Sequence, residues 1–381
     1  MKPKAIVLGA GMVGATMARD LARDGEFSVT VADVSEPNLK KLAGQPNITT
    51  LRADLGDPAT LTSTVGPFDI VLGALPSRIG FRSLRTLIDA GKNYSDISFM
   101  PEDALEHDPA AKQRGVTAVV DCGVAPGLSN LIVGYAAAQL DEPLRAAIYV
   151  GGLPKLRRWP YQYKAPFAPS DVIEEYTRPA RMMENGRIVE KIALTEPELL
   201  TFEKLDTLEA FNTDGLRSLL KTMPIPNMTE KTIRYPGHVE LMRALRETGF
   251  FDTGEIDIRG QKVRPLDMTS KLLFPKWTYE PGEEEFTIMR VSVEGRKGNQ
   301  SVRHVYELYD EYDRTRNESS MSRTTAFPAT IMARMIVEGR IRQKGVIPPE
   351  LLAREPGLFD QVLSALRSRG VNVTHKVEPI T

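Results

Sequence analysis

The sequence predicts an α/β fold, a doubly wound parallel sheet, with a second α+β domain built on a mixed sheet. Three observations lead to this prediction. In the first third of the chain, short apolar runs alternate with helical stripes, which is typical of parallel strands joined by crossover helices. A glycine-rich segment directly follows the first apolar run. Beyond Pro126, longer strand candidates follow one another with few helices between them, as in a mixed sheet.

The elements of the first domain follow from two patterns, the continuous apolar run of a buried strand and the helical spacing of apolar residues. Val13, Met17 and Leu21 recur at helical spacing after the glycine-rich segment. Asp57-Pro58 opens a further helix, with Asp as the cap and Pro in the first turn. A parallel sheet covered by helices on both faces is therefore expected. The six candidate strands are residues 5–8, 28–32, 48–53, 70–75, 94–97 and 117–120.

The second domain is expected to follow the sixth strand. The polar, glycine-containing segment 294–301 predicts a hairpin connection between two long strands. A helix over 330–337, with Pro328 near its start, is expected to return to the first domain and pack on it. The strand candidates of this part of the chain are residues 146–150, parts of 195–211, 286–293 and 302–309.

Composition excludes several classes of protein. A chain of 381 residues suits two domains better than one core. Lys+Arg 49 against Asp+Glu 50 leaves a net charge of −1, which gives no reason to expect nucleic acid or a membrane as partner. The single cysteine, Cys122, cannot build a disulfide framework and fits a reducing, cytoplasmic compartment. With four His and one Cys, no metal site is expected.

The strongest motif is the G-x-G-x-x-G segment between the first strand and the first helix. The first glycine permits a tight turn, the second lets the backbone approach a pyrophosphate, and the third lets the helix pack closely on the sheet. The helix N-terminus then offers free N–H groups to the phosphates. This combination is the fingerprint of a Rossmann dinucleotide-binding domain. Its residues are Gly9, Ala10, Gly11, Met12, Val13 and Gly14.

An acid at the end of the second strand favours NAD over NADP. Asp33 is placed to accept hydrogen bonds from the adenosine ribose and to repel a 2′-phosphate, and neither Val34 nor Ser35 supplies an arginine. The alternative is that Asp33 caps a helix that starts near Pro37. Asp54, at the end of the third strand, lines the adenine side or forms a turn.

The ends of the later strands are expected to complete the cofactor site, because ligands of doubly wound sheets lie at the carboxyl ends of the strands. Asp96 lies near the carboxyl end of the fifth strand. No sequence feature activates the Cys122 thiol as a nucleophile, so a small buried residue near the cofactor is expected there. The cofactor-binding residues nominated by this rule are Ala74, Leu75, Pro76, Cys122 and Gly123.

Several segments outside the fingerprint resemble the saccharopine dehydrogenase superfamily, and together they run over most of the chain. Within it, Tyr163, Phe167 and segments 176–180 and 231–238 resemble the L-lysine 6-dehydrogenases. That resemblance implies NAD-dependent oxidation of the terminal amine of lysine, or of a similar amine, with release of ammonia. The segments that carry the superfamily resemblance are residues 121–127, 149–154, 208–215, 231–238, 322–326 and 344–350.

Two alternatives remain open. Saccharopine-forming reductases look as if they carry an Arg between the Asn and the Asp of a motif whose residues here are Asn212 and Asp214. An Arg at that position suits a substrate carboxylate. Thr213 in this sequence weakens oxidation or formation of saccharopine as the activity, although Arg217 or Arg234 could substitute. A non-catalytic, NAD-sensing Rossmann protein is the second alternative, and the long second half of the chain argues against it.

Amine oxidation defines the roles that the site must fill. A lysine amine with a pKa of roughly 10.4 must lose a proton before hydride can leave the adjacent carbon. Arg234 is the expected partner of the substrate carboxylate. Lys231 and Arg234 could instead form one solvated strand face, and His238 could cap the helix that follows it. The candidate bases are Asp96, Lys231 and His238, and the candidate substrate-binding residues are Tyr163, Asn212 and Arg234.

The sequence thus predicts a dinucleotide-binding domain over residues 1–125, completed by 320–381, and a substrate and dimerisation domain over 126–319. The expected cofactor is NAD, and the expected ligand is a small amino acid. The expected assembly is a homo-oligomer, a homodimer in the simplest case.

Overall fold

The structure is a computed structural model that describes residues 2–203 and 205–380. The chain divides into two compact units. The first unit comprises Met1–Gln139, Arg217–Met223 and Ser322–Val373, and the second comprises Leu140–Leu216, Pro224–Met321 and Thr374–Thr381.

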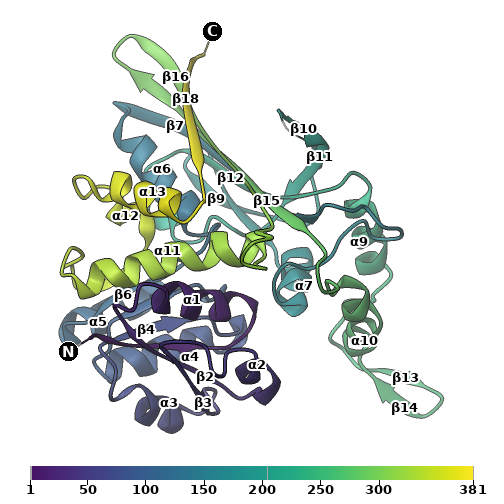
Figure 1. The fold of residues 1–381 in the computed structure, drawn as a ribbon. Helices are drawn as coiled ribbons and strands as arrows, with labels where there is room; N and C mark the ends of the chain where they lie inside the picture. Colours follow the sequence, from purple (N-terminus) through teal and green to yellow (C-terminus); the bar gives the residue numbers. More distant parts are fainter. Residues whose placement is uncertain (1, 204, 381) are drawn as a thin grey trace. The chain divides into compact units, whose positions relative to one another are not determined.

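The first unit contains a seven-stranded parallel sheet in the order β17-β6-β5-β4-β1-β2-β3. Figure 1 labels β2, β3, β4 and β6 of this sheet. Its strands are β1 (Lys4–Leu8), β2 (Ser28–Asp33), β3 (Ile48–Arg52), β4 (Ile70–Gly73), β5 (Tyr94–Asp96), β6 (Thr117–Val119) and β17 (Gly345–Ile347). The order reverses between β1 and β4, as in a doubly wound sheet. The predicted fold class is confirmed. The seventh strand, β17, was missed, because it joins the sheet beside β6 from a distant part of the chain.

Helices connect and cover this sheet. They are α1 (Met12–Ala22), α2 (Glu36–Lys40), α3 (Pro58–Val65), α4 (Ser77–Asp89), α5 (Asp108–Arg114), α6 (Leu128–Ala138), α8 (Leu219–Thr222), α12 (Pro349–Leu352) and α13 (Leu358–Ser368), with α11 (Ser320–Val337) returning from the second unit. Within the described residues, no helix combines the length and the apolar character that crossing a membrane requires.

The second unit contains a nine-stranded sheet with the order β10-β11-β12-β7-β15-β16-β18 and with β8 and β9 attached beside β12. It is mixed, since β12 and β7 are parallel whereas β15 is antiparallel to β7. The strands are β7 (Glu142–Pro154), β8 (Ala180–Glu184), β9 (Arg187–Lys191), β10 (Glu198–Phe202), β11 (Leu205–Asn212), β12 (Asn227–Arg234), β15 (Glu285–Lys297), β16 (Gln300–Glu311) and β18 (Val373–Pro379).

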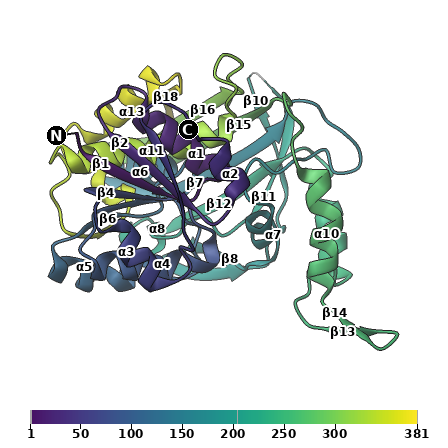
Figure 2. The same ribbon diagram turned by 60° about the horizontal axis from the view of Figure 1, so that its bottom comes forward.

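Three helices and a small hairpin complete the second unit. The helices are α7 (Pro169–Thr177), α9 (His238–Glu247) and α10 (Pro265–Trp277). The hairpin of β13 (Ile256–Ile258) and β14 (Gln261–Val263) lies at the end of α10 away from the nine-stranded sheet (Figure 2).

The division into units differs from the predicted domain boundaries at four places, the smallest of which moves Ser320 and Met321 to the second unit. The first unit extends past residue 125 through α6, where a Cβ atom on Gly134 would lie 2.3 Å from the Glu350 carbonyl oxygen. Arg217–Met223 also belongs to the first unit, because the Arg217 guanidinium forms a buried ion pair with Asp121. Residues 374–380 join the second unit, because β18 extends its sheet beside β16.

Helix α11 starts ten residues earlier than predicted, at Ser320, and Pro328 lies inside it. A proline removes one helical N–H donor, which made Pro328 a natural start signal in the sequence. The C-terminal half packs on the first unit as expected. Thr330 Oγ1 donates to Asp20 at 2.6 Å, and the Arg334 guanidinium pairs with Glu26 at 2.7 Å.

The predicted hairpin between the two long strands is present, but its turn is shorter than segment 294–301. Strands β15 and β16 stay paired as far as Lys297 and Gln300, which leaves a two-residue turn. Strand β7 likewise continues through Gly151 and Gly152 instead of ending there. A Cβ atom on Gly151 would lie 2.4 Å from the Ile233 carbonyl oxygen, so glycine permits close strand packing at this point.

Candidate functional site

The glycine-rich turn of the first unit is shaped as an anion site. Gly9 has a φ of 102°, and a Cβ atom there would lie 2.4 Å from the Ala74 carbonyl oxygen. A Cβ atom on Gly14 would lie 2.0 Å from the Gly9 carbonyl oxygen, whereas one on Gly11 would have no neighbour within 4 Å. Gly9 and Gly14 are therefore required for packing, and Gly11 leaves an open approach to the backbone.

The start of α1 adds the donors that such a site needs. Gly11 is the N-cap of α1, and no side chain caps the first turn. The first N–H groups of the helix, from Met12 and Val13 onward, therefore have no partner within the helix and favour a bound anion. The residues fit the pyrophosphate of a dinucleotide.

Asp33 ends β2 directly beside this turn. Its carboxylate accepts a hydrogen bond from Ala10 N at 2.6 Å and another from Ser35 N at 2.7 Å. The N-cap of α2 is Ser35, so the alternative that Asp33 caps this helix is wrong. Asp54 accepts from Gly56 N at 3.0 Å and thus forms the turn that was one of its two expected roles.

The residues after β4 and β6 line the same edge of the sheet. Ala74 packs against Gly9 and Gly14, Leu75 is buried, and Pro76 precedes α4 as its N-cap. Cys122 is also buried, and burial raises the pKa of its thiol to about 12. The thiol is therefore protonated at neutral pH, as expected of a packing residue. The backbone N–H of Gly123 donates to Pro126 O at 3.0 Å and shapes the loop after β6.

Asp96 is a buried acid at the end of β5. Its Oδ1 accepts hydrogen bonds from Tyr94 OH and Ser98 Oγ, both at 2.8 Å, whereas Oδ2 is buried without a hydrogen-bond partner among the described residues. Burial raises the pKa of this carboxyl to about 6. A Cβ atom on Gly73 would lie 1.9 Å from Tyr94 OH, so glycine makes room for the pair. A carboxylate with a free oxygen and a pKa near neutrality suits a general base.

Arg234 organises a buried aromatic cluster in the second unit. Its guanidinium donates to Glu175 at 2.8 Å, to Tyr176 OH at 3.2 Å and to Tyr163 OH at 3.3 Å. Nη1 donates a further hydrogen bond to the carbonyl oxygen of Ile233 at 2.9 Å. Four of the five guanidinium N–H groups thus have partners, and the second N–H on Nη1 has none among the described residues.

His238 belongs to the same cluster, and its contacts do not favour it as the base. Nε2 lies 2.9 Å from Tyr176 OH, and Nδ1 lies 2.9 Å from Tyr161 O. Burial and the nearby Arg234 charge lower the pKa of His238 to about 3. A neutral ring with both nitrogens engaged holds its neighbours in place. The N-cap of α9 is Gly237, so His238 is the first helical residue and not the cap.

Lys231 and Asn212 lie on the opposite face of the sheet from Arg234. Successive side chains of a strand point to opposite faces, so Lys231 and Arg234 of β12 diverge. Lys231 pairs with Glu198 at 2.7 Å, and Asn212 is its neighbour across the β11–β12 ladder. The alternative that Lys231 and Arg234 form one solvated face is wrong, since the two side chains are buried on different faces.

Glu230 is a buried acid that the sequence analysis missed. It lies on the Arg234 face of β12, it is 4% exposed, and it accepts a hydrogen bond from Thr213 Oγ1 at 2.7 Å. A Cβ atom on Gly215 would lie 2.4 Å from its carboxyl carbon. The one available signal was the alternation of Glu230, Thr232 and Arg234, three polar residues on one face of a central strand.

The Glu230 carboxyl predicts a specific pH dependence of stability. Burial raises its pKa from 4.5 to about 8. Its contribution to folding is therefore complete below pH 4.5 and is lost as the pH rises to about 8, by about 1.4 kcal/mol per pH unit in that window. Glu230→Gln, which removes the titration, is expected to flatten this slope in urea unfolding between pH 5 and pH 8. The exposed Glu203→Gln serves as the control, and an unchanged slope in Glu230→Gln would contradict the assignment.

Two family models match nearly the whole chain. Residues 5–119 match the saccharopine dehydrogenase NADP binding domain, and residues 123–371 match the saccharopine dehydrogenase C-terminal domain. The second match alone covers more than half of the chain.

The curated relatives have low sequence identity to this chain, but their matches cover most of it. The mitochondrial alpha-aminoadipic semialdehyde synthase of Bos taurus is 21% identical over 98% of this chain, which spans about half (48%) of that protein. The carboxyaminopropylagmatine dehydrogenase of Synechocystis sp. is 22% identical, and the match covers 93% of this chain and 94% of the relative. Among solved structures, the apo saccharopine dehydrogenase (L-Glu forming) from Saccharomyces cerevisiae has a TM-score of 0.81 at 17% identity and covers 99% of this chain and 100% of its own. That likeness shows a shared fold.

Proposed function

The chain belongs to the saccharopine dehydrogenase family, and we propose that it is an NAD-dependent oxidoreductase that oxidatively deaminates the terminal amine of L-lysine or a similar amino acid. The observation that carries the proposal is the open approach to Gly11 at the uncapped start of α1, with the Asp33 carboxylate beside it. Bound NAD+ would supply the hydride acceptor.

The reaction has a simple balance. The protonated terminal amine first gives up one proton, and the carbon that bears it then gives up a hydride, which leaves an iminium ion. Water then adds to the iminium carbon, ammonia and a proton leave, and an aldehyde remains. We assign the proton to Asp96, because its Oδ2 lacks a hydrogen-bond partner among the described residues and its pKa of about 6 lets it accept a proton at neutral pH.

The substrate end of the proposal rests on the second unit. We assign the α-carboxylate to Arg234, whose planar guanidinium keeps one N–H on Nη1, and we assign an orienting role to Tyr163. Glu230 lies on the same sheet face, and its pKa of about 8 keeps it mainly uncharged at neutral pH, so it adds a hydrogen-bonding carboxyl group and not a further charge.

Cofactor preference is the first test. Asp33→Ala combined with Val34→Arg is expected to shift the ratio of NADP to NAD affinity by about tenfold or more, because it removes the carboxylate and adds a phosphate partner. Val34 is 61% exposed, so an arginine fits at this position. Calorimetric titration of both cofactors measures the ratio, with Val34→Arg alone as control. Tighter binding of NADP than NAD by the native protein would overturn the assignment.

A substrate panel decides the activity. Lysine, ornithine, saccharopine and other amines are supplied with NAD or NADP, and absorbance of the reduced cofactor is followed. We expect reduction with NAD and lysine or a close analogue. Reduction with saccharopine alone would establish the second candidate, which the names of the relatives favour. No reduction with any substrate, together with NAD binding, would indicate a cofactor-sensing protein.

The position of Thr213 favours lysine over saccharopine. The Thr213 hydroxyl donates to Glu230 at 2.7 Å and lies 2.9 Å from the Thr232 hydroxyl. It is neutral and already hydrogen-bonded, so it offers no positive charge to the additional carboxylates of saccharopine. The neighbouring Asp214 accepts two hydrogen bonds from the Arg181 guanidinium, at 2.9 and 2.7 Å. That arginine is therefore already engaged with an acid.

Two further parts of the proposal concern the setting of the enzyme. The single, buried Cys122 thiol fits a cytoplasmic location. A homodimer is the expected assembly, which sedimentation velocity would test.

A further inference from the structure

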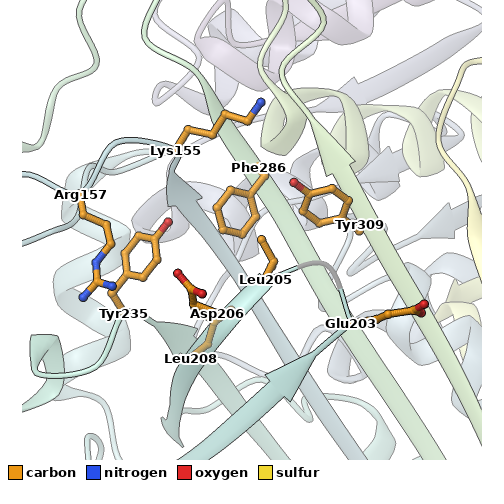
Figure 3. Close-up of a pocket in the computed structure, with 9 residues that line it drawn as sticks. All are labelled: Lys155, Arg157, Glu203, Leu205, Asp206, Leu208, Tyr235, Phe286 and Tyr309. Carbon is orange, nitrogen blue, oxygen red and sulfur yellow. The ribbon is translucent and has the colours of Figure 1, made fainter.

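A cavity of about 480 Å³ lies in the second unit, lined by the residues that Figure 3 labels. One of them, Leu208 of β11, lies on the face of the sheet opposite to Arg234, since Glu209 is the residue paired with Arg234. The apolar lining of the cavity comes from Leu208, Tyr235 and Phe286, which pack in one cluster with Ile233. Tyr163 and Tyr176, which contact Arg234, belong to a different cluster. The cavity is therefore separate from the proposed substrate residues, and its size lies within the usual range for small-molecule sites.

Two charged side chains of opposite sign stand at the cavity without an ion-pair partner among the described residues. Arg157 stacks over the Tyr235 ring at 4.7 Å and donates through Nε to Gln162, which leaves its two terminal nitrogens for another acceptor. Asp206 lies near Tyr235, and its charge contributes to the raised pKa of that phenol. Figure 3 shows the Arg157 and Asp206 side chains on either side of the Tyr235 ring.

The remaining cation of the cavity is already neutralised. Lys155 pairs with Glu311 at 2.7 Å and with Glu284 at 3.3 Å. Lys155 therefore lies at the edge of the cavity as an ion-paired side chain and adds no unpaired charge.

Among the described residues that line the cavity, Arg157 is the cation without an ion-pair partner, and Asp206 and Glu203 are the acids without one. Figure 3 shows the Glu203 side chain directed away from Arg157 and Tyr235, whereas Asp206 lies beside the Tyr235 ring. Arg157 and Asp206 therefore form the pair of opposite charges beside the apolar lining.

We propose that this cavity binds a free α-amino acid with an aromatic or large aliphatic side chain. The Arg157 guanidinium receives the carboxylate in a two-pronged contact, and the Asp206 carboxylate receives the ammonium group. The side chain of the ligand covers Leu208 and Phe286, which removes apolar surface from water. A purely anionic or purely cationic ligand would leave one of the two charges unpaired.

The cavity is connected by the chain to the proposed substrate cluster. Tyr235 follows Arg234 directly, and its hydroxyl donates to Pro154 O at 2.9 Å at the start of the loop that carries Tyr161 and Tyr163. An amino acid that fixes Arg157 therefore also restrains this loop. The cavity and the proposed substrate cluster thus share this loop, although binding in the cavity does not depend on the proposed activity.

Binding of L-phenylalanine in the absence of NAD tests the proposal by calorimetry. We expect L-phenylalanine to bind at least about tenfold more tightly than 3-phenylpropionate or phenethylamine, each of which lacks one charged group. Arg157→Gln and Asp206→Asn are expected to weaken L-phenylalanine binding by a similar factor, with unchanged unfolding temperatures. Arg158→Gln is the matched control, because Arg158 pairs with Glu283 outside the cavity lining.

Two outcomes would overturn the inference. One is that neither L-phenylalanine nor L-leucine binds at millimolar concentration. The other is that both variants bind L-phenylalanine like the native protein. Failure of the proposed oxidation of lysine affects neither measurement, because the titrations contain no cofactor and change no residue assigned to the reaction.

Discussion

Replacement of Gly11 by valine is expected to lower the affinity for NAD by about 100-fold or more. A Cβ atom on Gly11 meets nothing within 4 Å in the structure, but it would occupy the approach through which a pyrophosphate reaches the N–H groups of α1. Loss of charge-assisted hydrogen bonds worth about 1.5–3 kcal/mol each accounts for a change of this size. The fold should lose at most about 1 kcal/mol, the difference between glycine and valine as an N-cap.

The neighbouring glycine distinguishes binding from folding. A Cβ atom on Gly14 would lie 2.0 Å from the Gly9 carbonyl oxygen, so Gly14→Ala is expected to lower the free energy of unfolding by about 1–3 kcal/mol or more. Gly254→Val, at a glycine of the second unit with open space around it, is the control for both measurements. NAD titration and urea unfolding of the three variants check the pattern. A Gly11→Val variant that binds NAD like the native protein would place the pyrophosphate elsewhere.

Replacement of Arg234 by lysine is expected to raise the KM for the amino-acid substrate by about tenfold or more. Lysine keeps a positive charge for Glu175, but it lacks the planar fork that lets Arg234 donate to Tyr163 and Tyr176 while one N–H on Nη1 stays available to a carboxylate. Loss of one charge-assisted hydrogen bond, about 1.5–3 kcal/mol, corresponds to at least a tenfold change. The affinity for NAD should not change, since the glycine-rich turn belongs to the first unit.

A matched substitution controls for the loss of an arginine on this sheet. Arg290 of β15 pairs with Glu307 and stacks over Phe202, so Arg290→Lys changes a similar ion pair outside the Arg234 cluster. Steady-state kinetics of both variants, with unfolding curves to show that each is folded, complete the test. If Arg234→Lys alters stability but leaves KM unchanged, Arg234 serves only as the counter-ion of Glu175.

Features that depend on neighbouring residues were predictable from the sequence. The alternation of apolar runs and helical stripes indicated the doubly wound sheet, because strand and helix periods are properties of a few consecutive residues. The roles of Gly9 and Gly14 were predictable for the same reason: their positions in the strand-turn-helix pattern define where the backbone has no room for a side chain. The seventh strand, β17, escaped because it receives its partner, β6, from a distant part of the chain.

Only the tertiary structure showed that the proposed substrate residues lie on different faces of the sheet and that Glu230 is a buried acid. Lys231 and Arg234 are close in sequence, yet β12 directs them to opposite faces, where different strands and loops surround them. The raised pKa of Glu230 and the lowered pKa of His238 follow from burial, which is imposed by residues far apart in the chain. The sequence by itself determined the fold class and the cofactor turn, because local sterics and periodicity suffice for them. Which side chains share a face, and which of them lose their water, depends on long-range packing, and that packing exists only in the folded chain.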